Sequence, residues 1–170
     1  LNCSTLDIIQ GKLSGVTLIA NGILFQSLPL DYAEFESEPI KINFKLNRGG
    51  QILKLEHPFN IQGRVIISGK NLQAALTSNK WRWLGELLSH ELIRTKSLTG
   101  LKIKNDYFEL ILPKENHKNP VKTSFRIKAV DGKILLSQDD NHKEILLPMD
   151  PSIIIKRAFL KDEKLHLIGH

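Results

Sequence analysis

The chain has 170 residues, 41% hydrophobic and 25% charged, which is the composition of one globular domain with a sizeable core. Its single cysteine, Cys3, excludes an intramolecular disulfide framework and a cysteine-based zinc site. Residues 94–133 contain ten Lys/Arg and four Asp/Glu, and this block holds the whole net charge of +6. We therefore expect an anionic partner: a phospholipid head group, a membrane surface or a nucleic acid.

The first part of the sequence is predicted to form short strands. Asn21-Gly22 is a strong hairpin signal, so we expect the chain to reverse there. Residues 40–46 alternate apolar and polar side chains, the period of an antiparallel strand with one face in water. The expected strands are 16–20, 23–25, 30–35, 40–46, 52–55 and 59–67.

Residues 68–93 are the one stretch with a helical period. Ser68 follows an apolar run and occupies the position of an N-cap. The segment 77–79 has poor helix propensity, which predicts two short helices meeting at an angle. The apolar stripe consists of Leu72, Ala75 and Leu76, then Trp81, Leu84 and Leu88. An amphipathic pair of this kind is expected to pack on a sheet.

The remainder of the chain is again predicted as strands. Asp131-Gly132 predicts a hairpin after the longest alternating strand, and Asp139-Asp140 a hairpin tip. The expected strands are 101–104, 107–112, 121–129, 133–136, 145–147, 153–155 and 165–168. The predicted class is α+β: a long curved antiparallel sheet with one or two amphipathic helices packed against it, in a single domain over 1–170.

Catalytic motifs are incomplete in this sequence. His90-Glu91 begins a zinc-protease pattern, but Arg94 occupies the position of its second histidine. The phosphate-loop-like segment 63–70 has five residues between its glycines instead of four, and Asn71 stands where Ser or Thr would bind magnesium. We therefore expect no enzyme, no metal and no cofactor. No apolar run reaches the length of a membrane span, and the start at Leu1 suggests that a segment precedes it.

Several segments together resemble the LmeA-like phospholipid-binding protein family, a bacterial family. The segments are 10–16, 21–26, 68–76, 130–134, 144–149 and 165–169. The resemblance covers nearly the whole chain. It implies a sheet wrapped on central helices, as in tubular lipid-binding folds, and an apolar groove for acyl chains. It also implies non-enzymatic binding of phospholipid, or its transfer, in the cell envelope.

One sheet face and the helix stripe are predicted to form the apolar lining of a lipid site, or the core. These residues are Ile42, Phe44, Ile61, Leu72, Leu76, Leu84, Leu88, Ile103, Phe125 and Ile127. Aliphatic side chains suit acyl chains, at roughly 0.8 kcal/mol per buried methylene. The same side chains also fill an ordinary core, so a groove and a solid core are both compatible with the sequence.

Two features are candidates for membrane contact. The first is a cationic patch on the polar strand faces, formed by Lys102, Lys104, Lys122, Arg126 and Lys128. Anionic lipid would attract it, although a solvated sheet face has the same pattern. The second is Lys80-Trp81-Arg82-Trp83, which combines amphipathic rings with cations. Helical spacing predicts that Trp81 is buried and that Trp83 points to solvent or to the groove. The alternative is that both rings lie in the core.

Two other functions are compatible with these patterns. The basic block could bind nucleic acid, with Tyr107, Phe108 and Phe125 as stacking platforms, although both phenylalanines fall on apolar strand faces. The chain could instead be a structural envelope or assembly protein with a solid core. The phospholipid-binding function is the leading hypothesis, and it needs no nucleic acid.

Overall fold

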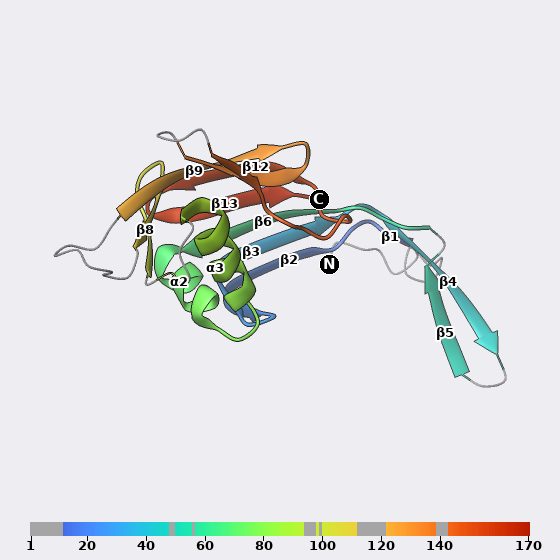
Figure 1. Ribbon diagram of the computed structural model, residues 1–170. Helices are drawn as coiled ribbons and strands as arrows, with labels where there is room; N and C mark the ends of the chain where they lie inside the picture. Colours follow the sequence, from blue (N-terminus) through green and yellow to red (C-terminus); the bar gives the residue numbers. More distant parts are fainter. Residues whose placement is uncertain are drawn as a thin grey trace.

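The computed structural model describes residues 12–47, 50–55, 57–93, 98, 100–111, 122–138 and 143–170. Most of the described chain is antiparallel β-sheet, and two short helices accompany it, so the α+β class is consistent with the fold (Figure 1). The described strands form three sheets instead of one long sheet. The single-domain organisation over residues 1–170 stays a prediction.

One five-stranded sheet contains the last two strands of the chain and has the order β12-β13-β6-β3-β2. Its strands are β12 (Ile155–Lys161), β13 (Lys164–Gly169), β6 (Ile61–Ser68), β3 (Leu28–Ser37) and β2 (Thr17–Phe25). All neighbours are antiparallel, and Val65 of β6 pairs with Leu167 on one side and Ala33 on the other. The inner face of this sheet is therefore apolar where β6 meets β13.

The second five-stranded sheet has the order β11-β10-β9-β8-β7. Its strands are β11 (Glu144–Leu146), β10 (Lys133–Ser137), β9 (Lys122–Val130), β8 (Phe108–Ile111) and β7 (Gly100–Ile103). A backbone hydrogen bond of 2.8 Å from Ile155 N to Gly132 O connects β12 to the β9–β10 turn. This contact brings the two five-stranded sheets together.

The third sheet consists of β1 (Lys12–Leu13), β4 (Ile40–Asn47) and β5 (Gly50–Leu55), in the order β1-β4-β5. Figure 1 shows β4 and β5 as an arm that extends away from the helices. The alternating strand predicted at 40–46 is thus present, but it does not belong to the sheets that meet the helices.

The turns follow the predictions only in part. The hairpin predicted at Asn21-Gly22 is wrong, because β2 continues through both residues and Gly22 alone adopts a positive φ of 60°. The reversal lies at Gln26-Ser27, with φ angles of 47° and 68°, which match the right-handed twist of the flanking strands. The Asp131-Gly132 hairpin is confirmed, with φ angles of 50° and 77°. Asp139-Asp140 lies outside the described residues.

The end of the chain also differs from its prediction. Residues 153 and 154 are not in a strand, and β12 begins only at Ile155. Its sequence, IKRAFLK, places two basic residues side by side and hides the period-2 alternation. The turn at Asp162-Glu163, with φ angles of 51° and 56°, then leads into β13.

The two helices predicted over 68–93 are confirmed as α2 (Gly69–Thr77) and α3 (Arg82–Leu88), followed by a π-helical turn at Ser89–Ile93. Ser68 is the N-cap of α2, and its Oγ accepts a hydrogen bond of 3.4 Å from Asn71 N. The Asp31 carboxylate accepts two further hydrogen bonds at this point, from Ser68 N at 2.5 Å and Asn71 Nδ2 at 3.1 Å. None of the described helices combines the length and apolar character needed to cross a bilayer.

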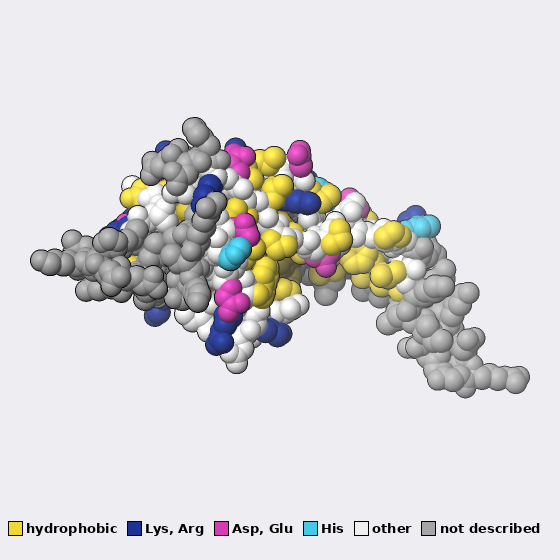
Figure 2. Space-filling view, in the orientation of Figure 1, with side chains coloured by type: hydrophobic (Ala, Val, Ile, Leu, Met, Phe, Trp, Pro, Cys, Tyr) yellow, Lys and Arg dark blue, Asp and Glu magenta, His cyan; other side chains and the backbone are white. Residues whose placement is uncertain are grey.

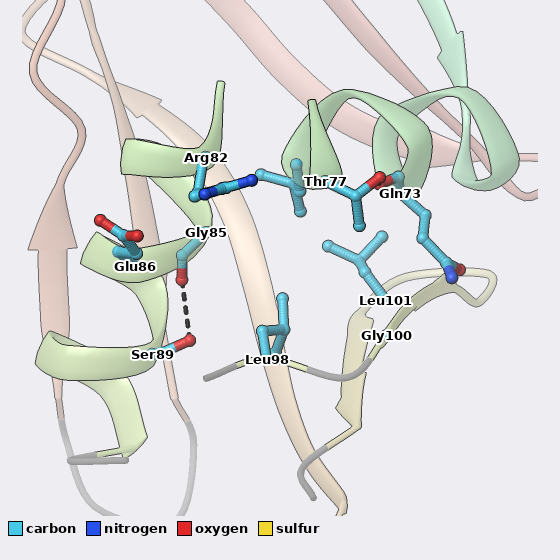
Figure 3. Close-up of a pocket in the computed structure, with 10 residues that line it drawn as sticks. Gln73, Thr77, Arg82, Gly85, Glu86, Ser89, Leu98, Gly100 and Leu101 are labelled. Atoms are coloured by element: carbon cyan, nitrogen blue, oxygen red, sulfur yellow. Dashed lines mark hydrogen bonds between the residues drawn. The ribbon is translucent and has the colours of Figure 1, made fainter. Parts of the chain in front are cut away.

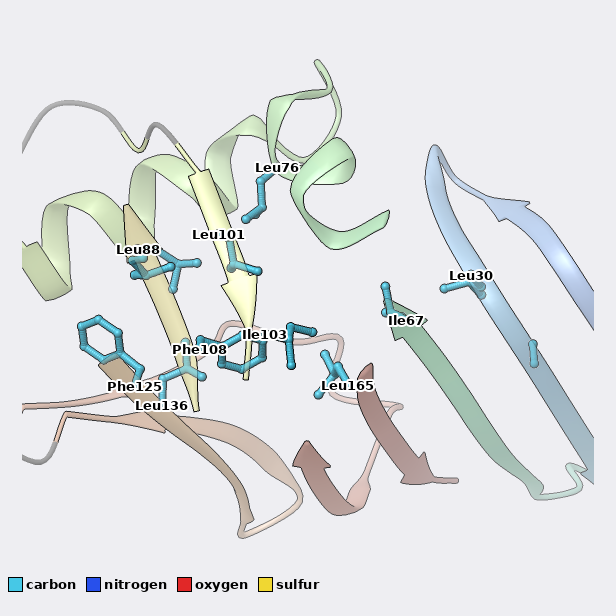
Figure 4. Close-up of a cluster of buried hydrophobic side chains, with 12 residues drawn as sticks. Leu30, Ile67, Leu76, Leu88, Leu101, Ile103, Phe108, Phe125, Leu136 and Leu165 are labelled. Carbon is cyan, nitrogen blue, oxygen red and sulfur yellow. The ribbon is translucent and has the colours of Figure 1, made fainter. Parts of the chain in front are cut away.

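The main core lies where the helices meet the two five-stranded sheets. In Figure 4, Leu76 and Leu88 from the helices point toward Leu101, Phe125 and Leu136 from the strands. Phe125 is 1% exposed, so the middle of β9 is among the most buried parts of the protein. These contacts hold the helices against the sheets and define the space between them.

Candidate functional site

A cavity of about 600 Å³ lies between the helices and the two five-stranded sheets. Its floor is formed by buried side chains, including Leu76 and Leu88 of the helices, Leu165 of β13 and Phe125 of β9. Of the 25 described residues that line it, only Gln26 and Asp150 have polar side chains, apart from the indole N–H groups of Trp81 and Trp83. Packed interiors leave few voids larger than a water molecule, so this space is large for a core. The floor of the cavity therefore favours the apolar parts of a ligand.

The opening of the cavity is marked by residues that both line it and are exposed to solvent. We call them the rim: Phe25, Gln26, Trp83, Pro148, Asp150 and Ile153. They come from the β2–β3 turn, the start of α3 and the segment that precedes β12. Phe25 is 57%, Ile153 49% and Trp83 44% exposed. Figure 2 shows hydrophobic side chains gathered beside the helices in the middle of the view.

Trp81 and Trp83 both line the cavity, and Trp83 lies at its rim with 44% exposure, as predicted, whereas Trp81 is half-buried instead of buried. Their ring centroids are 6.3 Å apart and the rings are stacked, with an angle of 27° between their planes. Trp81 Nε1 donates a hydrogen bond of 3.0 Å to the carbonyl oxygen of Gln26. The prediction assumed one helix through both residues, whereas Trp81 precedes α3 and has a non-helical backbone.

The predicted lining residues fall into two groups. Six of the ten line the cavity together: Leu72, Leu76, Leu84, Leu88, Phe125 and Ile127. Ile103 is buried in the core beside them without lining the cavity. Ile42 lies half-buried on β4, in the third sheet, and the side chain of Phe44 lies outside the described residues.

The prediction that Ile61 belongs to the apolar lining or the core is wrong, because Ile61 is 46% exposed. The strand that contains it becomes buried only toward its other end, where Ile67 is 3% exposed beneath the helices. Alternation correctly places Ile61 and Ile67 on one face of β6. It does not show how far along the strand that face is covered.

A sequence model of the LmeA-like phospholipid-binding family matches residues 4–146. The chain belongs to this family. The match spans more than four fifths of the chain and ends just before β12, so β12 and β13 lie beyond it. Comparison with curated proteins and with solved structures gave no match. Family membership assigns lipid binding in general, and the geometry of this member allows finer proposals.

Parts of the cavity of this LmeA-like protein were missed by the sequence analysis. The missed residues are Phe25, Gln26 and Leu28 of the β2–β3 turn, the segment from Leu147 to Ile153, and Leu165 and Leu167 of β13. The turn was missed because the hairpin was predicted five residues too early. The segment before β12 has no regular period, so nothing local indicates that it returns to the helices.

The basic block of this family member is partly paired with acidic residues. Lys122 Nζ lies 3.2 Å from Glu109 Oε1, Lys128 Nζ 3.5 Å from Glu144 Oε1, and Arg126 Nη1 4.0 Å from Asp106 Oδ2. Glu109 lies on β8, Glu144 on β11 and Asp106 in the turn between β7 and β8, and these carboxylates reduce the net positive charge of the patch. Lys102 is exposed and Lys104 is half-buried. Four other cations of the block, Arg94, Lys96, Lys114 and Lys118, lie outside the described residues.

Two of the three rings considered as a stacking platform for nucleic acid are buried. Phe108 is 5% and Phe125 1% exposed, and both line the cavity instead. Tyr107 is half-buried. The two phenylalanines of the basic block therefore belong to the interior of the fold.

A second, more polar cavity of about 330 Å³ lies beside the first. Gln73, Thr77, Arg82, Glu86 and Ser89 surround it (Figure 3), and Ser89 Oγ donates a hydrogen bond of 2.8 Å to Gly85 O. Leu76 and Leu101 line both cavities. Their side chains form the wall between the two spaces.

The charge at the rim is negative. Hydrogen bonds from the Ser152 hydroxyl and backbone amide hold the pKa of Asp150 below its ordinary value, so its carboxylate is ionised at neutral pH. Among the described residues that line the cavity, Asp150 is the only ionisable one. Among the described residues, no group of His, Cys, Asp and Glu side chains could hold a metal ion.

Proposed function

We propose that the protein binds a phospholipid without chemical conversion, with the acyl chains in the 600 Å³ cavity. The observation that carries the proposal is the apolar lining, in which 23 of 25 residues have no polar function beyond the indole N–H groups. The volume lies within the range of roughly 300–1,000 Å³ typical of ligand sites. Burial of each methylene contributes about 0.8 kcal/mol, so an acyl chain has a strong preference for this space.

In this proposal the head group stays at the rim. A phosphate placed on the apolar floor would lose its hydration without gaining hydrogen bonds, which is unfavourable by several kcal/mol. Gln26 and Asp150, the two polar side chains of the lining, are both at the rim. A ligand held this way can return to a membrane, which makes transfer of lipid the natural extension of binding. Helices closing the space between two sheets would then be this protein's form of a tubular lipid-binding fold.

We further propose that the rim contacts the bilayer through Lys80-Trp81-Arg82-Trp83 and the β2–β3 turn. Trp83, Phe25 and Leu24 are 44%, 57% and 72% exposed, and exposed Lys80 and Arg82 flank the tryptophans. Indole rings favour the head-group region, and neighbouring cations can reach lipid phosphates. The paired residues Lys122, Arg126 and Lys128 contribute less, since their charges are partly neutralised. The family suggests the cell envelope as the place of action.

The deciding experiment is extraction of the purified protein with organic solvent and mass spectrometry of the extract. We expect co-purified phospholipid in the parent and a strong loss in Leu84→Trp, which fills the cavity without adding charge. Leu146→Trp is the matched control, because Leu146 is 51% exposed and does not line the cavity. A parent without phospholipid, or a folded Leu84→Trp variant that retains as much as the control, would contradict the proposal.

A further inference from the structure

Strand β2 forms one edge of its five-stranded sheet and is chemically unprotected. It pairs with β3 on one side, and no described strand pairs with its other side. Its nine residues, TLIANGILF, include no charge and no proline. Leu18, Ile19 and Leu24 on this strand are 57%, 56% and 72% exposed. Edge strands normally avoid association by means of charged residues, prolines or short length, and β2 has none of these.

The sequence of β2 is nearly the same when it is read backward. From Leu18 to Leu24 it reads LIANGIL, with Asn21 at the centre and Ala20 and Gly22 as the only pair that differ. When two identical strands pair antiparallel about a two-fold axis, the residue at the axis lies opposite itself. A residue n positions before it then lies opposite the residue n positions after it in the other copy. The pattern is therefore self-complementary: leucine opposite leucine, isoleucine opposite isoleucine, and the small residues opposite each other.

We propose that β2 pairs with β2 of a second copy of this chain, antiparallel and centred on Asn21, so that two five-stranded sheets join into one. Leu18 of each copy then lies opposite Leu24 of the other, and Ile19 opposite Ile23. Apolar cross-strand pairs of this kind stabilise sheets, and no like charges meet across the axis. Gly22 bends the strand beside the centre through its positive φ. In the proposed pair, Gly22 of each copy lies opposite Ala20 of the other, so only small side chains meet at this bend.

The arrangement has a consequence for the cavity. Phe25, at the end of β2, belongs to the rim and would lie opposite Thr17 of the second copy. The second copy then lies beside the opening of each cavity. This inference does not depend on lipid binding, since it rests on the edge strand and its symmetry.

The first test is the mass of the parent in solution without lipid, measured by analytical ultracentrifugation at micromolar concentration. We expect twice the chain mass. Ile19→Lys should raise the dimer dissociation constant by about tenfold or more, because it places a charge against the apolar partner strand at two symmetric positions. Ile19 is exposed, so this variant retains its fold. A parent that sediments as a monomer would overturn the proposal.

The second test fixes the register by disulfide formation in a Cys3→Ser background. Asn21→Cys places two thiols opposite each other, with Cα atoms about 4.5–5.5 Å apart, within disulfide range. Ile19→Cys is the matched control, because its two copies would be four residues apart along the pair, about 13 Å. We expect a cross-linked dimer from Asn21→Cys, and from Ile19→Cys only when it is mixed with Ile23→Cys. The proposed pairing would be overturned if Ile19→Cys by itself cross-linked as strongly as Asn21→Cys. It would also be overturned if neither variant, nor the mixture of Ile19→Cys with Ile23→Cys, gave a cross-linked dimer.

Discussion

The indole rings of Trp81 and Trp83 stack with their centroids 6.3 Å apart, although the two residues are separated by one position in the sequence. The stack exists because Trp81 lies before the first turn of α3, where the backbone is free to turn its ring toward the cavity. Its Nε1–Gln26 hydrogen bond then connects the start of α3 to the β2–β3 turn. Two of the three segments that form the rim are thereby joined.

Loss of this connection should destabilise the protein modestly. Trp81→Phe retains an aromatic ring but removes the donor to Gln26 O, so we expect a decrease in the free energy of unfolding of about 1 kcal/mol. Trp83→Phe is the control, since no hydrogen bond of Trp83 to the β2–β3 turn is present in the described structure. Urea denaturation followed by circular dichroism measures both. Equal effects of the two substitutions would mean that the ring, and not its N–H group, supports the rim.

Trp83 should report membrane contact by fluorescence. In a Trp81→Phe background Trp83 is the only tryptophan, and its 44% exposed ring should enter the head-group region when vesicles are added. We expect its emission to shift to the blue. The Trp83→Phe variant, with only the more buried Trp81, should shift less. Binding demonstrated by flotation without any shift of Trp83 would place the contact elsewhere.

Charge reversal should distinguish the two candidate basic surfaces. Lys80→Glu with Arg82→Glu changes two cations next to the rim, and attraction to anionic lipid is worth about 1 kcal/mol per cation near the surface. We expect binding to anionic vesicles to fall by more than about tenfold at low salt. Lys122→Glu with Lys128→Glu, which alters residues already paired with carboxylates, should have the smaller effect in the same sedimentation assay. A larger effect of the second pair would assign the contact to the sheet face.

Asp31 should make stability depend on pH on the acid side. Partial burial raises the pKa of Asp31, but hydrogen bonds from Ser68 and Asn71 lower it by more, so the folded-state pKa is below the ordinary value. Its contribution is complete above the unfolded pKa of about 3.9 and is lost as the pH falls through the folded value. Asp31→Asn should cost about 1 kcal/mol at pH 7. The difference in unfolding free energy between parent and variant should shrink below about pH 4; a constant difference would exclude this role.

Local periodicity predicted the parts of the fold whose determinants are local. The break at 77–79, the N-cap at Ser68 and the turn at Asp131-Gly132 depend on a few adjacent residues, and all three are confirmed. The stripe from Leu72 to Leu88 likewise follows from helical spacing. Six of the ten residues named for the lining come together at the cavity because the same stripe faces the sheets.

The remaining features depend on contacts between distant segments. The hairpin signal of Asn21-Gly22 is overridden because β3 pairs along the whole of β2, and the turn at Gln26-Ser27 lacks glycine. The rim combines residues 25–26, 83 and 148–153, whose proximity no local pattern encodes. Burial along β6 changes from Ile61 to Ile67 because the helices cover only one end of that strand.

The wall made by Leu76 and Leu101 sets how far a bound chain can extend. In the proposed function, these two side chains limit the length of the bound acyl chain. An acyl chain that meets them must end or turn, because the second cavity behind them is lined by polar groups. Shortening either side chain would lengthen the permitted tail, and a bulkier one would shorten it. If the proposed function holds, the volumes of these two side chains set the selectivity for acyl-chain length.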